Sequence, residues 1–496
     1  MIAFGTGGWR GIIGKDFTYD NICLVAQGLA DMIIRDNKQH MPVMIGFDRR
    51  FLSFDAARWV AETLCANGIP VWFMKRTAPT PLVMYTVKAK GLFYGVQITA
   101  SHNPPTYNGI KLIVEGGRDA SEEITARLEK LTALIEESNR HPESMPFALA
   151  EEKGLITYPQ NPFNDFIDSI QGCIKMDLIR EKGLRILFDP MHGSGAYPLM
   201  VLLYTARCTV DYINFERDAY FGGHMPAPSE MSLRELSYKV TARGYDLGIA
   251  FDGDGDRLGI IDSNGRYITA NEILVLLYYY LHEHRGWRGP VVRNYSTTHM
   301  LDKLAASFGE KCYEVPVGFK HISRMIEQSD AVLGGESSGG LTVRGHIPGK
   351  DSVYAAALLV EAVSALKKSP SQILDGLYRK LGMHVALEDS LDLLPEEKAA
   401  VEKDVMQQRH LPRFAQEIDR VSYEDGCMVY FPDGSFIICR FSGTEPKLRL
   451  FAEAQDEARA LDLVDRFRQY IDDLLLGPGI WASRERSAPA TGSGIG

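Results

Sequence analysis

The sequence predicts three consecutive α/β units followed by a smaller α+β domain, and three observations lead to this fold class. The chain has 496 residues, and at about 150 residues per domain this length corresponds to three or four domains. Short β-branched or aromatic runs alternate with helical patterns, and the alternation starts again near residues 184 and 290. Beyond residue 370 a hairpin pattern replaces it.

The predicted strands of the three α/β units are short and mostly apolar, as buried strands are. They are residues 42–48, 69–74 and 94–99, then 184–189, 210–213 and 246–252, then 290–294, 311–317 and 331–334. Residues 54–67, between the first two strands, have helical spacing, and strand–helix–strand order indicates a parallel sheet. Residues 122–138 have the charged, amphipathic pattern of a surface helix.

The fourth domain begins after Lys367-Lys368-Ser369-Pro370, which has the composition of a boundary before a new helix. Asp433-Gly434 separates two predicted strands, 428–431 and 436–440, and this dipeptide is typical of a tight hairpin turn. A strand at 448–452 and a helix at 457–475 complete the domain. The predicted domains are 1–150, 151–257, 258–369 and 370–482, and the small, polar tail 483–496 is expected to be disordered.

Composition and charge exclude several classes of protein. Hydrophobic residues make up 45% and charged residues 24%, which is ordinary for a soluble globular chain. The net charge of −10 argues against nucleic acid or an anionic membrane as a partner. The longest apolar run, residues 273–281, is far shorter than the ~20 residues of a membrane span, and no secretory signal pattern begins the chain. Seven cysteines without C-x-x-C spacing favour a reducing cytoplasm over a disulfide scaffold or a zinc site.

Three polar loops follow predicted strands at corresponding places in the three α/β units. They are Thr99–Pro104, Asp252–Arg257 and Gly334–Gly340. Ligands of open α/β sheets gather at the carboxyl ends of the strands. We therefore expect the three loops to face one shared cleft.

Asp252, Asp254 and Asp256 alternate with glycines, so their carboxylates can fold around one hard cation such as Mg²⁺, Mn²⁺ or Ca²⁺. An EF-hand is rejected because the loop positions that need glycine and glutamate hold Arg257 and Ser263. Three ligands leave a metal open to substrate, as catalysis requires. The alternative is an ordinary solvent-exposed Asp/Gly turn.

Ser101 is a candidate nucleophile. Its neighbour His102 is expected to point away from it, and no G-x-S-x-G elbow occurs, which argues against a hydrolase pair. Beside three carboxylates, a serine is better suited to carrying a phosphoryl group, whose charge then needs a cation and basic side chains such as Lys111 and Arg257. The alternative is that Ser-His-Asn-Pro is only a turn.

Two further loops carry groups that suit a phosphorylated sugar. Glu336 and Ser338 can hydrogen-bond adjacent sugar hydroxyls, although their glycine-rich loop is also compatible with a flexible connection. In the fourth domain, Arg440 and Arg449 flank a turn that exposes amides and two hydroxyls, which is a plausible anion nest. No P-loop sequence occurs, so nucleoside triphosphates are not favoured.

Together with residues 4–11 (FGTGGWRG), these loops resemble the motifs of the α-D-phosphohexomutase family, the phosphoglucomutase/phosphomannomutase group, in the same order and over nearly the whole chain. The resemblance implies three consecutive mixed-sheet α/β domains plus a C-terminal α+β domain around a central cleft. It also implies that Ser101 is phosphorylated and that the three aspartates hold one Mg²⁺ together with a phosphoserine oxygen.

The resemblance assigns roles to other residues as well. It implies that Lys111 and Arg10 lie at the reacting group, and that Glu336 and Ser338 contact the sugar. The residues expected to bind the substrate in addition are Arg257, Lys350, Arg440, Ser442, Gly443, Thr444 and Arg449. The last four are expected to form the phosphate clamp of the family.

Two departures bear on the sugar. Some members, including dual glucose/mannose and glucosamine enzymes, have a histidine where this chain has Gly340. Residues 344–351 (RGHIPGKD) and 318–320 (GFK) resemble stretches of phosphoglucomutase-type members instead, although Ser352 stands where the family usually has glycine. Glucose is therefore favoured, and mannose remains open.

The expected reaction interconverts hexose 1-phosphate and hexose 6-phosphate through phosphoserine 101 and a hexose 1,6-bisphosphate, which is also the expected activator. Lys111 is the first candidate for general acid/base, because a desolvated lysine near other cations has a lowered pKa, and His346 and Lys320 follow. Alternatives are a phosphoserine-dependent sugar phosphatase and a non-catalytic sugar-phosphate sensor. A cytoplasmic monomer or homodimer is expected, and the sequence leaves the sugar and the phosphorylation state open.

Overall fold

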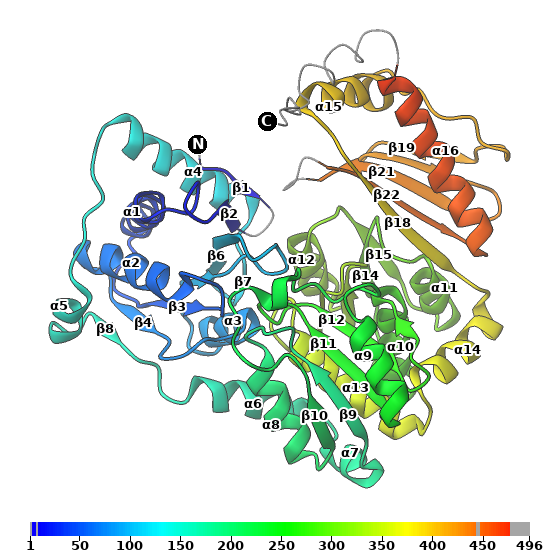
Figure 1. Ribbon diagram of the computed structural model, residues 1–496, viewed down its shortest axis with the longest axis horizontal. Coiled ribbons are helices and arrows are strands. Elements are labelled where there is room, and N and C mark those ends of the chain that lie inside the picture. The colour runs from blue at the N-terminus through cyan, green and yellow to red at the C-terminus, as the bar shows by residue number, and fades with distance from the viewer. Residues whose placement is uncertain (1, 6–7, 443–446, 477–496) are drawn as a thin grey trace, which may run out of the picture. The chain divides into compact units, whose positions relative to one another are not determined.

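The computed structural model describes residues 2–5, 8–442 and 447–476. These residues fall into two compact units (Figure 1). The first lies within Met1–Thr297 and Leu301–Gly376, and the second within Thr298–Met300 and Leu377–Gly496. No helix among the described residues is both long enough and apolar enough to cross a membrane.

The first sheet of the first unit has eight strands in the order β1-β2-β6-β5-β3-β4-β8, with β7 paired to β6. Its strands are β1 (Phe4–Gly5), β2 (Gly8–Ile12), β3 (Val43–Phe47), β4 (Val71–Phe73), β5 (Tyr94–Ile98), β6 (Tyr107–Val114), β7 (Arg118–Asp119) and β8 (Ile156–Thr157). The strands β8, β4, β3 and β5 are parallel to one another, β6 runs antiparallel to β5, and β2 runs antiparallel to β6, so the sheet is mixed.

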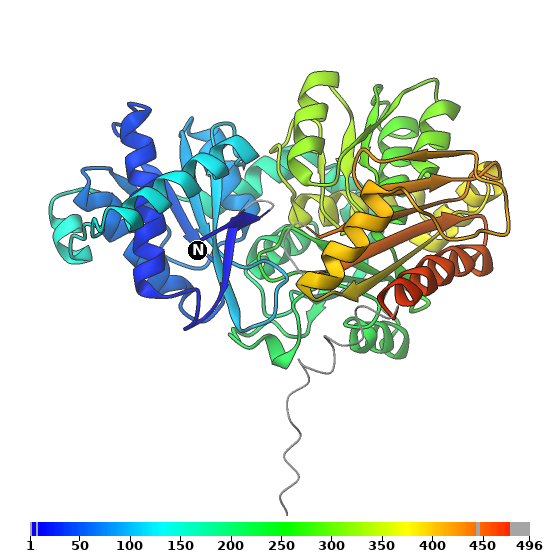
Figure 2. The same cartoon turned by 90° about the horizontal axis from the view of Figure 1, so that it is seen from above.

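Five helices accompany this sheet. They are α1 (Tyr19–Arg35), α2 (Ser53–Ala66), α3 (Thr80–Ala89), α4 (Glu122–Glu137) and α5 (Phe147–Glu152). The helix α1 packs against α4 and α2, as Figures 1 and 2 show, and α3 packs against β3 and β5. Ser121 caps α4 by accepting a hydrogen bond from the Ile124 amide.

The second and third sheets also mix parallel and antiparallel pairs. The second, β10-β9-β11-β12-β13, contains β9 (Arg185–Asp189), β10 (Thr209–Tyr212), β11 (Leu247–Phe251), β12 (Leu258–Asp262) and β13 (Tyr267–Ile268). The third, β15-β14-β16-β17, contains β14 (Val291–Asn294), β15 (Cys312–Val315), β16 (Leu333–Gly335) and β17 (Leu341–Val343). Within each sheet the last strands turn back antiparallel, immediately after the loops that carry the candidate site.

Helices connect and cover these strands. They are α6 (Pro162–Cys173), α7 (Met176–Lys182), α8 (Ala196–Thr205), the 3₁₀ turn η1 (Phe221–Gly223), α9 (Arg234–Arg243), α10 (Ala270–Glu283), α11 (Met300–Ser307), α12 (Phe319–Ser329), α13 (Ser352–Leu366) and α14 (Pro370–Leu381). The apolar run predicted to be too short for a membrane is the buried helix α10.

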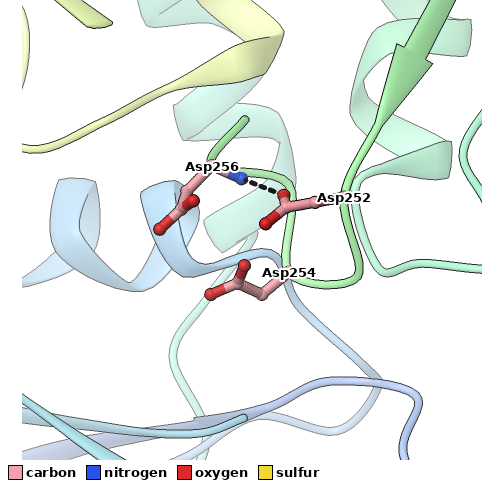
Figure 3. Close-up of side chains that lie close together, drawn as sticks. All are labelled: Asp252, Asp254 and Asp256. Atoms are coloured by element: carbon pink, nitrogen blue, oxygen red, sulfur yellow. Dashed lines mark hydrogen bonds between the residues drawn. The ribbon is translucent and has the colours of Figure 1, made fainter. Parts of the chain in front are cut away.

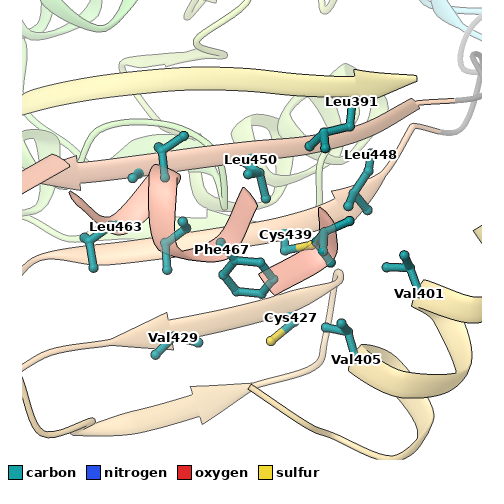
Figure 4. Packing of buried hydrophobic residues seen from close by; sticks show 14 of the residues in the cluster. Leu391, Val401, Val405, Cys427, Val429, Cys439, Leu448, Leu450, Leu463 and Phe467 are labelled. Atoms are coloured by element: carbon teal, nitrogen blue, oxygen red, sulfur yellow. The ribbon is translucent and has the colours of Figure 1, made fainter. Parts of the chain in front are cut away.

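The second unit is an antiparallel sheet covered by helices. Its strand order is β18-β22-β21-β20-β19, with β18 (Val385–Asp392), β19 (Arg420–Ser422), β20 (Cys427–Tyr430), β21 (Phe436–Phe441) and β22 (Lys447–Ala454). Its helices are α15 (Pro395–Val401), the π-helical turn η2 (Glu402–Gln407) and α16 (Glu457–Leu475). Figure 4 shows Phe467 of α16 among Cys427, Val429 and Leu450, which form part of one buried apolar core.

The predicted fold class is confirmed: three mixed-sheet α/β arrangements precede an α+β domain. Two sheets extend past the predicted boundaries, since β8 lies beyond residue 150 and β12 and β13 lie beyond residue 257. The strand β8 pairs with the distant strand β4, which no local pattern reveals. The strands β12 and β13 pair with their sequence neighbours, β11 and β12, as antiparallel strands that the sequence analysis did not include. All seven cysteines are free thiols. The predicted disordered tail, 483–496, lies outside the described residues.

Candidate active site

The loop after β11 brings three carboxylates together. One oxygen from each of Asp252, Asp254 and Asp256 lies within 4.8 Å of the others, and all three side chains are buried (Figure 3). Asp252 Oδ1 accepts hydrogen bonds from the backbone amides of Asp256 (2.9 Å) and Arg257 (3.1 Å), which curl the loop. Gly253 is required here, because a Cβ at that position would lie 2.7 Å from the Ser101 carbonyl oxygen.

The donor set of this loop suits a hard metal ion. Asp254 Oδ1 and Asp256 Oδ1 are buried and have no hydrogen-bond partner, and buried polar atoms are seldom left in that state. Burial and the charges of Asp254 and Asp256 raise the pKa of Asp252 well above its ordinary value. Bringing a divalent cation among these oxygens would satisfy the unpaired atoms and relieve the repulsion, so the residues fit such an ion.

Ser101 lies directly against this cluster. Its hydroxyl donates a hydrogen bond to Asp252 Oδ2 over 2.9 Å, and the residue is 1% exposed. Its backbone is left-handed, with φ of 51°. The expectation that His102 points away is wrong, because His102 Nδ1 lies 3.4 Å from Ser101 Oγ. Burial, followed by the charge of Arg257, lowers the pKa of His102 well below its ordinary value, so this ring is neutral.

Three basic side chains from different elements surround the carboxylates. Lys111 on β6 reaches Asp254 Oδ2 (3.2 Å) and Asp256 Oδ2 (2.9 Å) with its ammonium group. Lys350 Nζ lies 3.1 Å from Asp256 Oδ2. Arg10 on β2 donates a hydrogen bond to Asn103 Oδ1 over 2.7 Å, at the end of the Ser101 loop. The structure thus brings residues 10, 101, 111 and 350 to the aspartate loop.

The pKa of Lys111 differs from the expectation. Burial by itself lowers this pKa, but the adjacent carboxylates of Asp254 and Asp256 outweigh burial and raise the pKa above its ordinary value. The expectation of a lowered pKa considered burial and nearby cations and left out the effect of the two carboxylates. In the protein as described, Lys111 is therefore a protonated ion-pair partner.

The other two acid/base candidates bond elsewhere. His346 Nε2 lies 2.6 Å from Asp351 Oδ2, and its ring packs against Tyr354 and Phe166. Lys320 forms an ion pair with Glu122 at the start of α4. Neither contact includes the aspartate loop.

The third loop is held in shape by its own glutamate. Glu336 Oε1 accepts hydrogen bonds from Asn294 Nδ2 (3.1 Å) and the Gly318 amide (3.2 Å), and Ser338 Oγ donates to Glu336 Oε2 over 3.3 Å. The Gly339 carbonyl accepts from the Leu258 amide over 3.2 Å, which ties this loop to the residues directly after the aspartates.

The absence of a histidine at position 340 has a steric explanation. A Cβ on Gly340 would lie 2.1 Å from Cδ of Lys350, far inside van der Waals contact. The stem of Lys350 therefore occupies the space that a side chain at position 340 needs, and its ammonium group extends on to Asp256.

Sequence reasoning missed two residues that hold the aspartate loop. Thr80, at the start of α3, donates its hydroxyl to Asp254 Oδ2 over 2.6 Å. Ser352, at the start of α13, donates its hydroxyl to the Gly255 carbonyl over 2.5 Å. Ser352 was visible as a departure from the family pattern, and its role is a backbone contact that no motif encodes.

The candidate phosphate clamp lies in the second unit. Arg440 on β21 and Arg449 on β22 are cross-strand partners, so their side chains start from the same face of the sheet. Arg440 Nε lies 3.6 Å from Asp425 Oδ1, and its side chain helps to line a cavity of about 290 Å³. Ser442 directly follows β21, whereas Gly443 and Thr444 lie outside the described residues. Two like charges facing each other repel, which favours an anion between them.

Comparison with known proteins covers the chain almost end to end. Models of the phosphoglucomutase/phosphomannomutase family match it in order: α/β/α domain I at residues 1–139, domain II at 164–265, domain III at 269–381 and the C-terminal domain at 385–469.

Whole-length relatives and a solved structure agree with these matches. The chain is 28% identical over 479 residues to a phosphoglucomutase/phosphomannomutase of Thermococcus kodakarensis, covering 96% of this chain and 99% of the relative. It is 30% identical over 463 residues to a Methanocella arvoryzae protein named "Probable phosphoglucosamine mutase", covering 93% and 95%. A phosphoglucomutase/phosphomannomutase family protein from Burkholderia thailandensis has the same fold, with a TM-score of 0.79, 24% identity and coverage of 96% and 99%. With its four domains matched in order, the chain belongs to the phosphoglucomutase/phosphomannomutase family of α-D-phosphohexomutases and is an enzyme of the phosphotransferase class.

Proposed function

We propose that this enzyme interconverts hexose 1-phosphate and hexose 6-phosphate through a phosphoserine at Ser101. The observation that carries the proposal is the Ser101 hydroxyl, which is buried and hydrogen-bonded to Asp252 beside two carboxylate oxygens that lack partners. In the first half-reaction the bond between phosphorus and Ser101 Oγ breaks as a sugar hydroxyl oxygen bonds to phosphorus. The resulting hexose 1,6-bisphosphate reverses its orientation in the active site. Its other phosphoryl group is then transferred to Ser101, which leaves the isomeric hexose monophosphate.

Asp252, Asp254 and Asp256 are the proposed ligands of one Mg²⁺, which supplies positive charge against the transferring phosphoryl group. The oxygen-only donor set and the two orphaned carboxylate oxygens support this choice. Arg10, Arg257 and Lys350 add fixed positive charge around the same position. Because this charge is built in before the substrate arrives, it need not reorganise during transfer.

Lys111 is the proposed general acid/base. It contacts Asp254 and Asp256 directly, whereas the other candidates, His346 and Lys320, bond to Asp351 and Glu122. A cation bound by these carboxylates would offset part of the negative charge that raises the pKa of Lys111. A lower pKa would bring the ammonium group closer to the range in which it can donate and accept a proton.

The substrate is the finer part of the proposal. Glucose phosphate is favoured and mannose phosphate remains open, on the strength of residues 344–351. Glucosamine phosphate is the second candidate, because several relatives, among them the Methanocella arvoryzae protein, are named for that sugar. Glu336 and Ser338 are the proposed contacts of the sugar hydroxyls. Arg440, Arg449 and residues 442–444 are the proposed clamp for the phosphate that is not reacting.

Three activities are separated by one assay. The enzyme receives glucose, mannose or glucosamine 1-phosphate with Mg²⁺ and a trace of glucose 1,6-bisphosphate, and both hexose 6-phosphate and free phosphate are measured. We expect hexose 6-phosphate, with the highest kcat/KM for glucose. Release of free phosphate alone would identify a phosphatase, and binding without turnover would identify a sensor. We also propose a cytoplasmic location, which the seven free thiols support, and a monomer or homodimer.

A further inference from the structure

Arg50 is a fully buried arginine behind the Ser101 loop, in the connection between β3 and α2. Its guanidinium group donates to four backbone carbonyls of one loop. Nη2 donates to Ser101 (2.6 Å) and Asn103 (2.7 Å), and Nη1 donates to Pro104 (2.9 Å) and Tyr107 (3.1 Å). One side chain thus holds the backbone along the loop that begins at Ser101.

Asp48 connects this arginine to the other side of Ser101. Asp48 Oδ2 lies 3.3 Å from Arg50 Nε and accepts a hydrogen bond from Thr99 Oγ1 over 2.7 Å. Thr99 Oγ1 in turn accepts a hydrogen bond from the Ser101 amide over 2.8 Å. The second oxygen, Asp48 Oδ1, accepts from Ser53 Oγ (2.6 Å) and the Arg50 amide (2.9 Å). Both carboxylate oxygens of Asp48 therefore have hydrogen-bond or ion-pair partners.

The hydrogen bonds of Arg50 and those of the Asp48–Thr99 pair both end at Ser101, which has an unfavourable backbone conformation. Ser101 has φ of 51°, which residues other than glycine adopt only where the surroundings enforce it. Its amide is bound through Thr99 and its carbonyl is bound by Arg50. Rotating the backbone towards a relaxed conformation would break both hydrogen bonds and move Oγ away from Asp252.

We propose that Asp48 and Arg50 are positioning residues that hold Ser101 in this left-handed conformation, with Oγ aimed at the aspartate cluster. This inference rests on the proposed function, since it gives the phosphoserine loop its geometry. Neither side chain hydrogen-bonds to Ser101 Oγ or to the three aspartates, and both act through the backbone. Lysine cannot replace Arg50, because a single ammonium point cannot serve four carbonyls that are matched by a planar fork.

The test compares Arg50→Lys with Arg49→Lys. Arg49 is the matched control, because it also donates to backbone carbonyls, those of Phe215 (2.7 Å) and His192 (3.4 Å), but to none of the Ser101 loop. We expect Arg50→Lys to lower kcat about 100-fold, to leave KM for glucose 1-phosphate within about twofold, and to fold normally by circular dichroism. Arg49→Lys keeps the wild-type kcat.

A second readout separates positioning from general damage. In single-turnover transfer from glucose 1,6-bisphosphate, Arg50→Lys is expected to reach the same final extent of Ser101 phosphorylation as the wild type, at a lower rate. A misfolded fraction would instead lower the extent. Thr99→Val removes the hydrogen bond between Thr99 and Asp48 and leaves Arg50 in place. It should show a smaller loss of kcat, again with a lower rate and an unchanged final extent of Ser101 phosphorylation. If Arg50→Lys does not fold, Thr99→Val is the variant that tests the inference.

The result that overturns the inference is a wild-type kcat and transfer rate in Arg50→Lys or, should that variant not fold, in Thr99→Val. A loss confined to KM would overturn it as well. Ser101→Ala is assayed alongside these variants. If Ser101→Ala retains turnover, the proposed function itself fails, whereas an inactive Ser101→Ala beside fully active Arg50→Lys rejects only the positioning role.

Discussion

At the scale of single residues, the left-handed backbone of Ser101 determines what its side chain meets. The conformation turns Oγ towards Asp252 and brings His102 Nδ1 to 3.4 Å from it. Adjacent side chains normally diverge in an extended chain, which is why the sequence predicted that His102 points away. A neutral ring beside the hydroxyl is compatible with a serine that exchanges a phosphoryl group.

Asp254→Asn tests the metal site one ligand at a time. Removing one of three charged ligands should raise the Mg²⁺ concentration for half-maximal activity by at least about 10–100-fold, the loss that even indirect supports of metal sites cause. Mg²⁺ titrations of activity measure it. Asp211→Asn is the control, because Asp211 is an exposed carboxylate of the same sheet that bonds to Tyr245. If the Mg²⁺ dependence of Asp254→Asn is unchanged, the assignment of the aspartates as Mg²⁺ ligands is wrong.

Gly340→Ala tests whether Lys350 fills the space beside position 340. The new Cβ would lie 2.1 Å from Lys350 Cδ, so the variant should lower the free energy of unfolding by about 1–3 kcal/mol, as overpacking does. The same substitution in a Lys350→Ala background should cost much less, since the stem is gone. Chemical denaturation of the four proteins measures this. Equal costs in both backgrounds would show that Lys350 lies elsewhere.

At the scale of secondary-structure elements, helix starts from two different α/β domains hold the aspartate loop. Thr80 begins α3 and bonds to Asp254, and Ser352 begins α13 and bonds to Gly255. Both contacts come from short hydroxyl side chains on the first residues of rigid helices, so the loop inherits the rigidity of the sheets behind it. In the second unit, the neighbouring strands β21 and β22 present Arg440 and Arg449 as a pair.

This arginine pair predicts a division of labour between two loops. Arg449→Ala should raise KM at least about tenfold for every hexose phosphate, with a smaller loss of kcat, because the clamp contacts a phosphate that all these substrates share. Glu336→Gln should instead change the ratio of kcat/KM for glucose over mannose phosphates. Steady-state kinetics with both sugars decide between the loops. A changed ratio in Arg449→Ala together with an unchanged one in Glu336→Gln contradicts this division.

At the scale of the whole molecule, much of the fold was predictable because local patterns repeat. The predicted strand 94–99 and helix 457–475 match β5 (Tyr94–Ile98) and α16 (Glu457–Leu475), since each carries its own apolar period. The strand β18 was missed, because Val385–Asp392 (VALEDSLD) has acidic residues in its second half and no regular apolar alternation, and it is stabilised by pairing with β22. Pairing with a strand that is distant in the sequence produces no local pattern of apolar and polar residues.

The sequence predicted which types of residue form the site, but it predicted only partly which way their side chains point. The aspartates and Ser101 meet as the motifs indicate. Lys320 pairs with Glu122 instead, and no motif specifies which way a long, flexible side chain points. Arg50 was missed for a related reason: arginine is seldom fully buried, and its four partners are carbonyl groups, which are identical at every position of the sequence.

The cysteines give a test of the packing inside each of the two units. Burial raises the pKa of every cysteine thiol, for example to about 12 for Cys65 and about 11 for Cys208 and Cys427. At pH 8 these thiols are protonated, and five of them are buried whereas Cys173 and Cys312 are partly buried, so a thiol-disulfide reagent should react slowly with the native protein. It should react with all seven in denaturant. Fast reaction of several thiols in the native state would contradict the packing described.

The central claim is that Ser101 carries the phosphoryl group. The direct measurement is to incubate the enzyme with glucose 1,6-bisphosphate and Mg²⁺, digest it, and locate the added phosphoryl mass by tandem mass spectrometry. The account predicts a single phosphorylated residue, Ser101, and a Ser101→Ala variant that is folded, unlabelled and several orders of magnitude slower in turnover. Phosphorylation of another residue, or near-normal turnover of Ser101→Ala, would contradict it.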